Sequence, residues 1–334
     1  MYRRYLTLTL FLLFTACSPS GVSPTNPPLA ATTLTPSLTP EPSGDGIHWT
    51  VHQSPVMDVG AAGAWNSALV GEPRVFKTDL GFDMIFVGQD GTLGGDSKVS
   101  PFFGYALGLA HSSDGINWME APGNPIIGLE GSDFGMLWHG GVIHAEEYFV
   151  YYTVGTTLDG RTGQRIFLAT SSNGVDWVTG GDPVIDLGPV GSHDGYTLLA
   201  PMVIVEDGLF KMWYNGMDEH GRMTINYATS PDGIAWTKYE GNPVLDLGPD
   251  TAAYYPAVIK VGEEYMMWFS SEGIRLATSP DGITWTLYPD AVIEKGDAGE
   301  WSSEAIYEPS VYFDGRVFHM WFTGSSGPFV EKIG

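Results

Sequence analysis

The residues that could bind or transform a ligand are aromatic, acidic and imidazole side chains lying between short apolar runs. The aromatic ones are Trp65, Phe134, Trp138, Tyr196, Tyr254, Tyr255, Trp301 and Tyr307. The polar ones beside them include Asp58, Asp133, His139, His193, Asp194, Asp250, Glu300, Glu304 and Glu308. Aromatic faces stack on the C–H faces of polyhydroxylated rings, while carboxylates and imidazoles hydrogen-bond to the hydroxyl groups. The combination predicts a site for a polyhydroxylated ligand.

Some of these side chains are better candidates than others. Those that we expect to contact the ligand are Trp65, Trp138, His139, His193, Tyr196, Tyr255 and Trp301. Glu72 and Glu308 each come directly before a proline at the start of an apolar run. The residue before proline favours extended backbone, so we expect both carboxylates in extended strands at one end of a shared channel. Carboxylates at such positions also cap loops or pair with Arg74, and a lone histidine is commonly satisfied by local hydrogen bonds.

The elements that must position these side chains repeat along the chain. Nearly the same phrase, Ser-x-Asp/Asn-Gly-x-x-Trp, occurs at 43–49, 112–118, 171–177, 230–236 and 279–285. A repeat of roughly 50 residues is typical of arrays such as propellers. Tryptophans that recur in every unit are expected to be scaffold. Trp213, Trp268 and Trp321, which share another repeat position, are expected in the core between units.

One unit, residues 201–243, contains four short runs rich in Val, Ile, Tyr and Trp, separated by Gly, Pro and Asp. Such runs predict strands, and the Asp-Gly pairs between them favour type I′ hairpins. The predicted fold class is therefore all-β, a five-bladed β-propeller of four-stranded antiparallel blades. Ile47–Ser54 carries a fourth-strand phrase before any first strand, which predicts a ring closed by the N-terminal strand. Gly334 aligns with the middle of a third strand, so either the last strand is short or the chain is a fragment.

The connections of this propeller differ between its two faces. Those between strands one and two, and between strands three and four, are tight Asp-Gly turns such as 114–115 and 207–208. The other connections are long and irregular, as at 186–199 and 294–307. Because long variable loops on a rigid scaffold carry binding residues, we expect the site on the second face.

Residues 1–17 have the features of a bacterial lipoprotein signal peptide. Tyr5–Phe14 form an apolar stretch that is too short to span a bilayer. It leads into Phe-Thr-Ala-Cys, which resembles a lipoprotein box with Cys17 as the acylated residue; a secretory signal with an incidental cysteine is the alternative. Residues 18–44, rich in Pro, Thr and Ser, predict a flexible tether, and 45–334 the propeller. We expect an extracytoplasmic protein anchored to a membrane through Cys17 alone.

Composition excludes several classes of partner and cofactor. A net charge of −24 repels phosphate backbones, which argues against nucleic acid. Cys17 is the only cysteine, so a disulfide within the chain is excluded. The sequence lacks GxxxxGKS/T, GxGxxG, HExxH and CxxC motifs, so it predicts no nucleotide cofactor and no metal site. A calcium ion in the central channel remains compatible with the sequence.

Three features together resemble the five-bladed glycoside hydrolases. They are the five blades, the Ser-x-Asp-Gly-x-x-Trp hairpins, and blade exits such as Asn242-Pro243-Val244 and Asp182-Pro183-Val184. This superfamily contains arabinanases, levansucrases and invertases, including family 43, 32 and 130-like enzymes. The resemblance covers about residues 45–334. The phrase is also similar to the sialidase Asp-box, but it is one residue shorter between Asp and Trp, and sialidases have six blades.

The resemblance implies a base or nucleophile, an auxiliary aspartate and a general acid around the channel mouth. Glycoside cleavage needs one carboxyl to protonate the leaving oxygen and another to activate water or attack. The carboxylates that we expect in these roles are Glu72, Asp194 and Glu308. Glu72 stands where the superfamily usually has Asp before Pro. Blades two and three show His139 and Ala200 at the matching positions, so the usual triad is incomplete.

Two functions follow from these observations. The first is a surface-anchored glycoside hydrolase or phosphorylase-like enzyme that acts on oligo- or polysaccharide. The second is a noncatalytic propeller that captures glycans for other enzymes. In both cases we expect a monomer whose partner is an oligo- or polysaccharide.

Overall fold

The computed structural model describes residues 44–91, 105–128, 139–144, 147–327 and 330–334, with backbone alone for 142–144. The predicted signal peptide, most of the predicted tether, Cys17 and Trp138 lie outside the described residues. All the regular elements in this part of the chain are strands. Among the described residues, no helix is long and apolar enough to cross a membrane.

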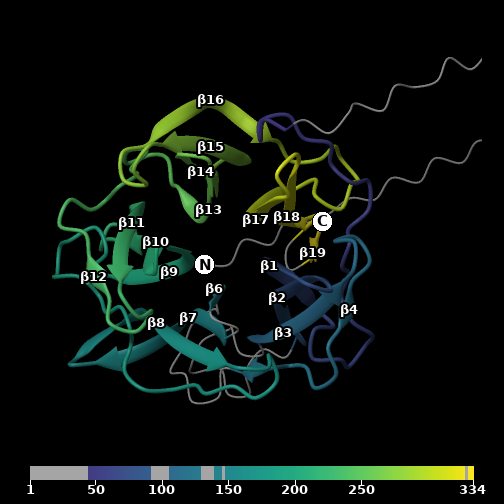
Figure 1. Cartoon of the computed structure of the whole chain (residues 1–334), viewed down its shortest axis with the longest axis horizontal. Helices are drawn as coiled ribbons and strands as arrows, with labels where there is room; N and C mark the ends of the chain where they lie inside the picture. Colours follow the sequence, from purple (N-terminus) through teal and green to yellow (C-terminus); the bar gives the residue numbers. More distant parts are fainter. Residues whose placement is uncertain (1–43, 92–104, 129–138, 145–146, 328–329) are drawn as a thin grey trace, which may run out of the picture. The chain divides into compact units, whose positions relative to one another are not determined.

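The strands form five small antiparallel sheets arranged in a ring (Figure 1). Blade one contains β1 (Leu69–Thr78), β2 (Gly81–Gln89), β3 (Tyr105–Ser112), β4 (Met119–Glu120) and β5 (Ile127–Gly128). Blade two contains β6 (His139–His144), β7 (Glu147–Leu158) and β8 (Arg161–Ser171). Blade three contains β9 (Thr197–Glu206), β10 (Leu209–Met217), β11 (Met223–Ser230) and β12 (Thr237–Lys238). Blade four contains β13 (Tyr254–Val261), β14 (Glu264–Ser270), β15 (Ile274–Ser279) and β16 (Thr286–Ile293), and blade five β17 (Ala305–Phe313), β18 (Phe318–Ser325) and β19 (Glu331–Ile333).

The predicted all-β, five-bladed fold is confirmed, with β1, β6, β9, β13 and β17 as the first strands of the blades. The prediction of four strands in every blade holds for blades three and four, whereas the described sheets of blades two and five have three strands and that of blade one has five. The ring closes differently in detail from the prediction. Ile47–Ser54 forms no strand, and the N-terminal segment joins blade five through a bridge between Met57 and Ile333. Because β19 offers only three residues for pairing, a long fourth strand has little to pair with there.

Each repeated phrase folds through hydrogen bonds among its own residues. In blade three, Ser230 Oγ accepts the Gly233 N–H at 2.9 Å, and Asp232 Oδ1 accepts the N–H groups of Ile234 and Ala235 at 2.9 and 2.8 Å. Of the Asp-Gly pair only Gly233 has a positive φ, of 77°. The type I′ prediction is therefore wrong for this phrase, since the aspartate caps the turn with its carboxylate. The Asp207-Gly208 turn does have positive φ at both residues, 51° and 78°.

The phrases also join each blade to the one before it. The Trp268 indole N–H of blade four donates to Gly46 O at 3.0 Å, and Trp49 packs edge-on against Trp268 with ring centroids 6.2 Å apart. Trp213 makes the same bond to Gly282, Trp321 to Gly115, and the Tyr151 hydroxyl to Gly233. The recurring aromatic residues are therefore scaffold between blades, as predicted. The N-terminal phrase at 43–49 makes for blade five the contact that the other phrases make for their own blades.

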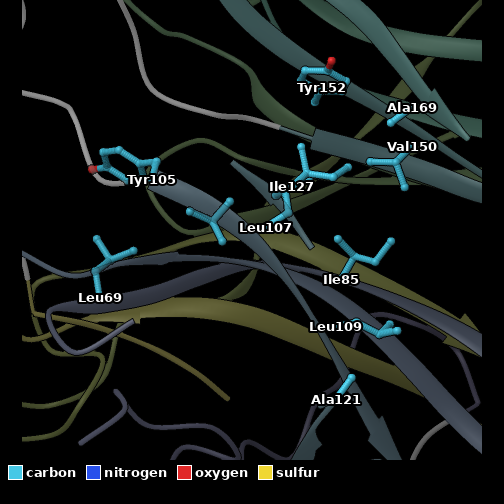
Figure 2. Packing of buried hydrophobic residues seen from close by; sticks show 11 residues of the cluster. Leu69, Ile85, Tyr105, Leu107, Leu109, Ala121, Ile127, Val150, Tyr152 and Ala169 are labelled. Carbon is cyan, nitrogen blue, oxygen red and sulfur yellow. The ribbon is translucent and has the colours of Figure 1, made fainter. Parts of the chain in front are cut away.

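The apolar core consists of clusters between adjacent blades. Figure 2 shows the cluster between blades one and two, where Leu107 and Ile127 lie with Val150 and Ala169 of blade two. Continuous burial between neighbouring sheets makes the ring a rigid frame for the residues at its centre.

Candidate active site

The inner strands carry a shared irregularity just where the candidate residues lie. Glu72, Ala200, Tyr255 and Glu308, each directly before a proline, have φ values of 53°, 45°, 53° and 60°. At each of them the pairing with the second strand of the blade shifts register. The expectation of extended backbone at these positions is wrong, because a β-bulge takes the residue out of the ladder and into the left-handed region. Such a conformation costs about 1–3 kcal/mol and has to be held by its surroundings.

Side chains of the preceding blade provide that support. The Tyr255 N–H donates to Asn215 Oδ1 of blade three at 2.9 Å, and the Glu308 N–H donates to Ser270 Oγ of blade four at 3.1 Å. The Glu72 N–H donates to Glu308 Oε2 of blade five at 3.0 Å. Blades three, four and five thus each satisfy the N–H group that the bulge of the next blade removes from its sheet.

The carboxyls of Glu72, Glu308 and Glu331 line one cavity of about 150 Å³. They come from β1, β17 and β19, so blades one and five supply all three. Glu308 is 5% exposed, and its Oε2 also accepts the Thr323 hydroxyl at 2.6 Å. Thr323 Oγ1 in turn accepts the Glu72 N–H at 2.8 Å. The hydrogen bonds tie Glu308 directly to the strained backbone of Glu72.

The burial of these carboxyls changes their acidity. Burial raises the pKa of Glu72 well above its ordinary value, and the Glu308 charge raises it further. Burial and then the Glu331 carboxyl raise the pKa of Glu308, although the Thr323 hydrogen bond works in the opposite direction. Burial also raises the pKa of Glu331. Because like charges in one buried site oppose ionisation, the cluster retains protons at a pH where exposed glutamates have lost them.

Arg74 joins three blades behind this cluster. Its guanidinium donates from Nη1 to the carbonyl of Pro309 in blade five at 2.8 Å. Its Nε donates to the carbonyl of His139 in blade two at 3.3 Å. Arg74 is 5% exposed, so its charge is buried and lies close enough to Glu72 and Glu308 to offset part of their repulsion.

His139 holds Glu72 from the other side. Its backbone N–H donates to Glu72 Oε2 at 3.2 Å, and its Nε2 lies 2.9 Å from the Glu72 carbonyl oxygen. Because a carbonyl oxygen only accepts, Nε2 carries the proton and Nδ1 has a free lone pair. Burial lowers the pKa of His139 to about 3, so the ring is neutral. Nδ1 is buried and has no hydrogen-bond partner in the described part of the chain.

A second cavity, of about 460 Å³, adjoins the first and shares Tyr255 and Tyr307 with it. The rings of Tyr254, Tyr255 and Tyr307 form a ladder, with successive centroids 5.9 and 6.1 Å apart and both interplanar angles 32°. Tyr254 is 36% exposed. Burial and the Glu308 charge raise the pKa of Tyr307, so its hydroxyl keeps its proton. A cavity of about 150 Å³ is of the size that holds a benzene ring, and the larger one gives room for a neighbouring group.

Asp194, the third predicted carboxylate, lies in a different environment and lines neither of these cavities. Its Oδ2 accepts Lys238 Nζ at 2.6 Å and the Tyr214 hydroxyl at 3.2 Å. Its Oδ1 accepts the Ser192 hydroxyl at 2.9 Å. Burial raises its pKa, but the Lys238 ammonium and Ser192 more than reverse this, so that the pKa is lowered. These contacts hold the loop before β9 against β10.

The loop that contains Asp194 recurs in blades one and five. The N–H groups of Gly60, Gly188 and Gly296 donate to the carbonyls of Asn66, Asp194 and Ser302 at 3.1, 3.0 and 3.0 Å. Trp65, His193 and Trp301 each precede the accepting residue. The Trp65 ring packs on Phe86 with centroids 5.5 Å apart, and Trp301 stacks on Phe322 at 5.4 Å. Both tryptophans therefore cover the second strands of their own blades, and Trp301 also lines a cavity of about 770 Å³.

The remaining predicted contact residues separate into two groups. Tyr255 and His139 lie at the carboxyl cluster, as described above. Tyr196 is 54% exposed and lines another cavity, of about 200 Å³, together with Arg161 and Glu219. Trp138 lies outside the described residues. Of the predicted site residues, the structure thus brings together Glu72, His139, Tyr255 and Glu308.

Sequence reasoning missed Glu331 and Tyr105, which also line the inner cavity. Each is the first residue of the third strand of its blade. The shared repeat position was the signal that could have found them, because it places their side chains beside the bulged residue of the first strand. Among the described residues, no group of three or more His, Cys, Asp or Glu side chains is arranged to hold a metal ion.

Comparison with solved structures places this geometry among known propellers. A glycoside hydrolase structure superposes with a TM-score of 0.68 at 16% identity, covering 84% of this chain and 90% of that one. A thermostable family-43 glycoside hydrolase gives 0.59 at 15% identity, covering 79% and 88%. The chain shares their fold. The predicted resemblance to five-bladed glycoside hydrolases is confirmed at that level.

Sequence comparison gives partial matches, and no family model matches the chain. An uncharacterised protein of Mycobacterium tuberculosis is 34% identical over 91 residues, which is 25% of this chain and 30% of that protein. An A type blood N-acetyl-alpha-D-galactosamine deacetylase of Flavonifractor plautii is 26% identical over 160 residues, 42% of this chain and 21% of that protein. A crystal structure of an N-acetylgalactosamine deacetylase from F. plautii, in complex with blood group B trisaccharide, superposes with a TM-score of 0.63 at 20% identity, covering 84% and 94%. The matched part thus spans less than a third of either curated relative.

Proposed function

We propose that this protein binds a glycan in the central cavity and cleaves a glycosidic bond there, with Glu72 and Glu308 as the acid–base pair. The observation that carries the proposal is that two glutamates from adjacent blades, Glu308 buried and Glu72 half-buried, line one cavity with Tyr255 and Tyr307. Glycoside hydrolysis uses such a carboxyl pair. The fold shared with glycoside hydrolases and with a deacetylase that binds a trisaccharide supports a carbohydrate ligand.

The surroundings of the two carboxyls suit different roles. The charged form of Glu308 is stabilised by the Thr323 hydroxyl and the Glu72 N–H, so Glu308 is the better base or nucleophile. Glu72, whose pKa burial raises well above its ordinary value, is the better acid. In the reaction Glu72 transfers its proton to the glycosidic oxygen as the C–O bond breaks. Glu308 attacks the anomeric carbon or takes a proton from the attacking water.

A noncatalytic glycan-binding propeller is the second candidate. The observation in its favour is that blade three presents Ala200 at the bulged position where blades one and five present carboxyls. Asp194, the nearest substitute in sequence, is engaged by Lys238. In that case the same cavity and tyrosines bind a glycan without turnover.

The deciding experiment screens the purified full chain against plant and microbial polysaccharides for release of reducing sugar. The panel includes Glu72→Gln, Glu308→Gln and, as a matched control on the opposite face, the exposed Glu264→Gln. We expect each cavity variant to lose turnover by about 100-fold or more while retaining binding, because loss of an acid or base removes about that factor. Unchanged release in both cavity variants would overturn the assignment. Binding of a glycan by the unmodified chain without release would favour the second candidate.

We also propose that Cys17 is lipidated and that the protein acts outside the cytoplasm as a membrane-anchored monomer. The support is the apolar stretch ahead of Cys17 and the Pro/Thr/Ser-rich tether behind it. Expressed in a bacterium, the chain should partition into detergent, whereas Cys17→Ser should not. Equal partitioning of both forms would refute lipidation.

A further inference from the structure

The described residues that line the two central cavities include several carboxyls and no basic side chain. The inner cavity presents Glu72, Glu308 and Glu331, and the outer one Asp250 and Glu272. Among the described residues, none that lines either cavity is Lys, Arg or His. A ligand entering this site therefore passes the exposed carboxyls of Asp250 and Glu272 before it reaches an acidic cluster whose described lining has no basic side chain.

Arg74 does not provide a positive charge that a ligand in either cavity could contact. It is the cation beside the carboxyls, yet it lies behind the inner cavity and is 5% exposed. Its Nε and Nη1 are bonded to the carbonyls of His139 and Pro309. An arginine binds a ligand carboxylate or sulfate best through a forked pair of free guanidinium donors. Two donors of Arg74 are already bonded to backbone carbonyls, so it lacks a free pair of this kind.

The tyrosine ladder also disfavours an anionic ligand, for a separate reason. Tyr254, Tyr255 and Tyr307 lead from the exposed outer cavity to the buried inner one. The face of an aromatic ring carries partial negative charge, so it attracts cations and the C–H bonds of neutral sugars and disfavours anions.

We propose that the site selects glycan units without negative charge, prefers those with a free amino group, and rejects uronates and sulfated sugars. This inference rests on the proposed function, since it assigns the substrate class of the same cavity. An ammonium group on a sugar ring can face the ladder and the carboxyls together. A uronate carboxylate would pass Asp250 and Glu272 and then lie beside three more acids with no basic partner in the described lining, so its charge would be desolvated without compensation.

The test is binding of the full chain to a glycan array that carries matched amino, neutral, uronate and sulfated oligosaccharides. We expect retention of amino and neutral glycans, with amino forms ahead of their neutral counterparts, and no retention of uronates. Preferential binding of uronates or sulfated glycans would overturn this inference and leave the proposed function standing. If no glycan of any class binds, the proposed function fails, and the inference fails with it.

Two charge-reversal variants show whether the cavity, and not the overall acidity, is responsible. Asp250→Lys changes an exposed residue at the rim of the outer cavity. Glu264→Lys makes the same change on the opposite face. We expect Asp250→Lys to weaken amino-glycan binding and raise uronate binding by at least about fivefold, the effect of one close charge pair in water, since the change removes one charge and adds the opposite one. An equal effect in both variants would show that net charge alone decides the preference, and would contradict the inference.

Discussion

Glu308 Oε2 accepts the backbone N–H of Glu72 at 3.0 Å, across the junction where the ring closes and 236 residues apart in the chain. One candidate catalytic carboxyl therefore supports the strained backbone of the other. The carboxyl of Glu308 and the backbone conformation of Glu72 are coupled, because removing the Glu308 oxygen leaves the partly buried N–H of Glu72 without one of its acceptors.

This coupling predicts different outcomes for two substitutions at Glu308. Gln retains an oxygen that can accept the N–H of Glu72 and the hydroxyl of Thr323, so Glu308→Gln should fold with nearly unchanged stability. Ala retains none, and Glu308→Ala should lower the free energy of unfolding by about 1–3 kcal/mol, because the Thr323 hydroxyl loses its acceptor and the Glu72 N–H loses one of two. Denaturant midpoints of the two variants test this. Equal midpoints would show that the hydrogen bond contributes nothing to the fold.

Stability should fall as pH rises above about 6.5. Burial raises the folded-state pKa of Glu72, Glu308 and Glu331 above their unfolded values, so the folded state binds more protons than the unfolded state. Stability from such groups is complete below the unfolded pKa and is lost as pH rises through the folded pKa. His139 has the opposite shift, but above its ordinary pKa of 6.5 it is neutral in both states.

Thermal melts between about pH 6.5 and about pH 8.5 measure this effect. We expect the melting temperature to drop across that window in the unmodified chain and to change less in the Glu72→Gln/Glu308→Gln double variant. The exposed Glu264→Gln should reproduce the drop of the unmodified chain. A double variant with the same pH dependence as the unmodified chain would place the responsible groups elsewhere.

Asp194 gives a third prediction, since its contacts favour a structural role. Asp194→Asn removes the charge that pairs with Lys238 at 2.6 Å but can retain the hydrogen bonds of Ser192 and Tyr214. The variant should lose about 1–3 kcal/mol of stability and keep its turnover per folded molecule. Parallel denaturation and activity assays separate the two effects. Full stability with abolished turnover would instead support the catalytic role that the sequence predicts.

The bond between Trp268 and Gly46 should be a measurable part of ring closure. Trp268→Phe keeps an aromatic ring but loses the indole N–H bond to Gly46 at 3.0 Å, so we expect a loss of about 1 kcal/mol. Trp268→Ala also opens a cavity in the core and should lose about 3–5 kcal/mol. Urea midpoints check both values. As a control, Trp177→Phe removes an indole hydrogen bond to Gly174 within its own phrase. We expect a smaller loss of stability from this variant than from Trp268→Phe.

The fold was predictable because its signals are local. In the phrase at 230–236 the serine, aspartate, glycine and tryptophan hydrogen-bond to one another within three positions, so their spacing alone indicates the turn. The carboxyl cluster was only partly predictable. Glu72 and Glu308 share a repeat position and were identified, whereas Glu331 occupies a third-strand position and was missed.

The sequence by itself determined the number of blades, the face with the long connections and the scaffold role of the repeated tryptophans, since these depend on short-range spacing and periodic apolar runs. Only the tertiary structure decided which acidic and aromatic residues share a cavity. The reason is physical: the bulges at Glu72, Tyr255 and Glu308 reverse the local backbone preference before proline, and they exist because a neighbouring blade satisfies each displaced N–H. A contact that forms only when the ring closes joins residues far apart in the chain, so the spacing of neighbouring residues cannot predict it.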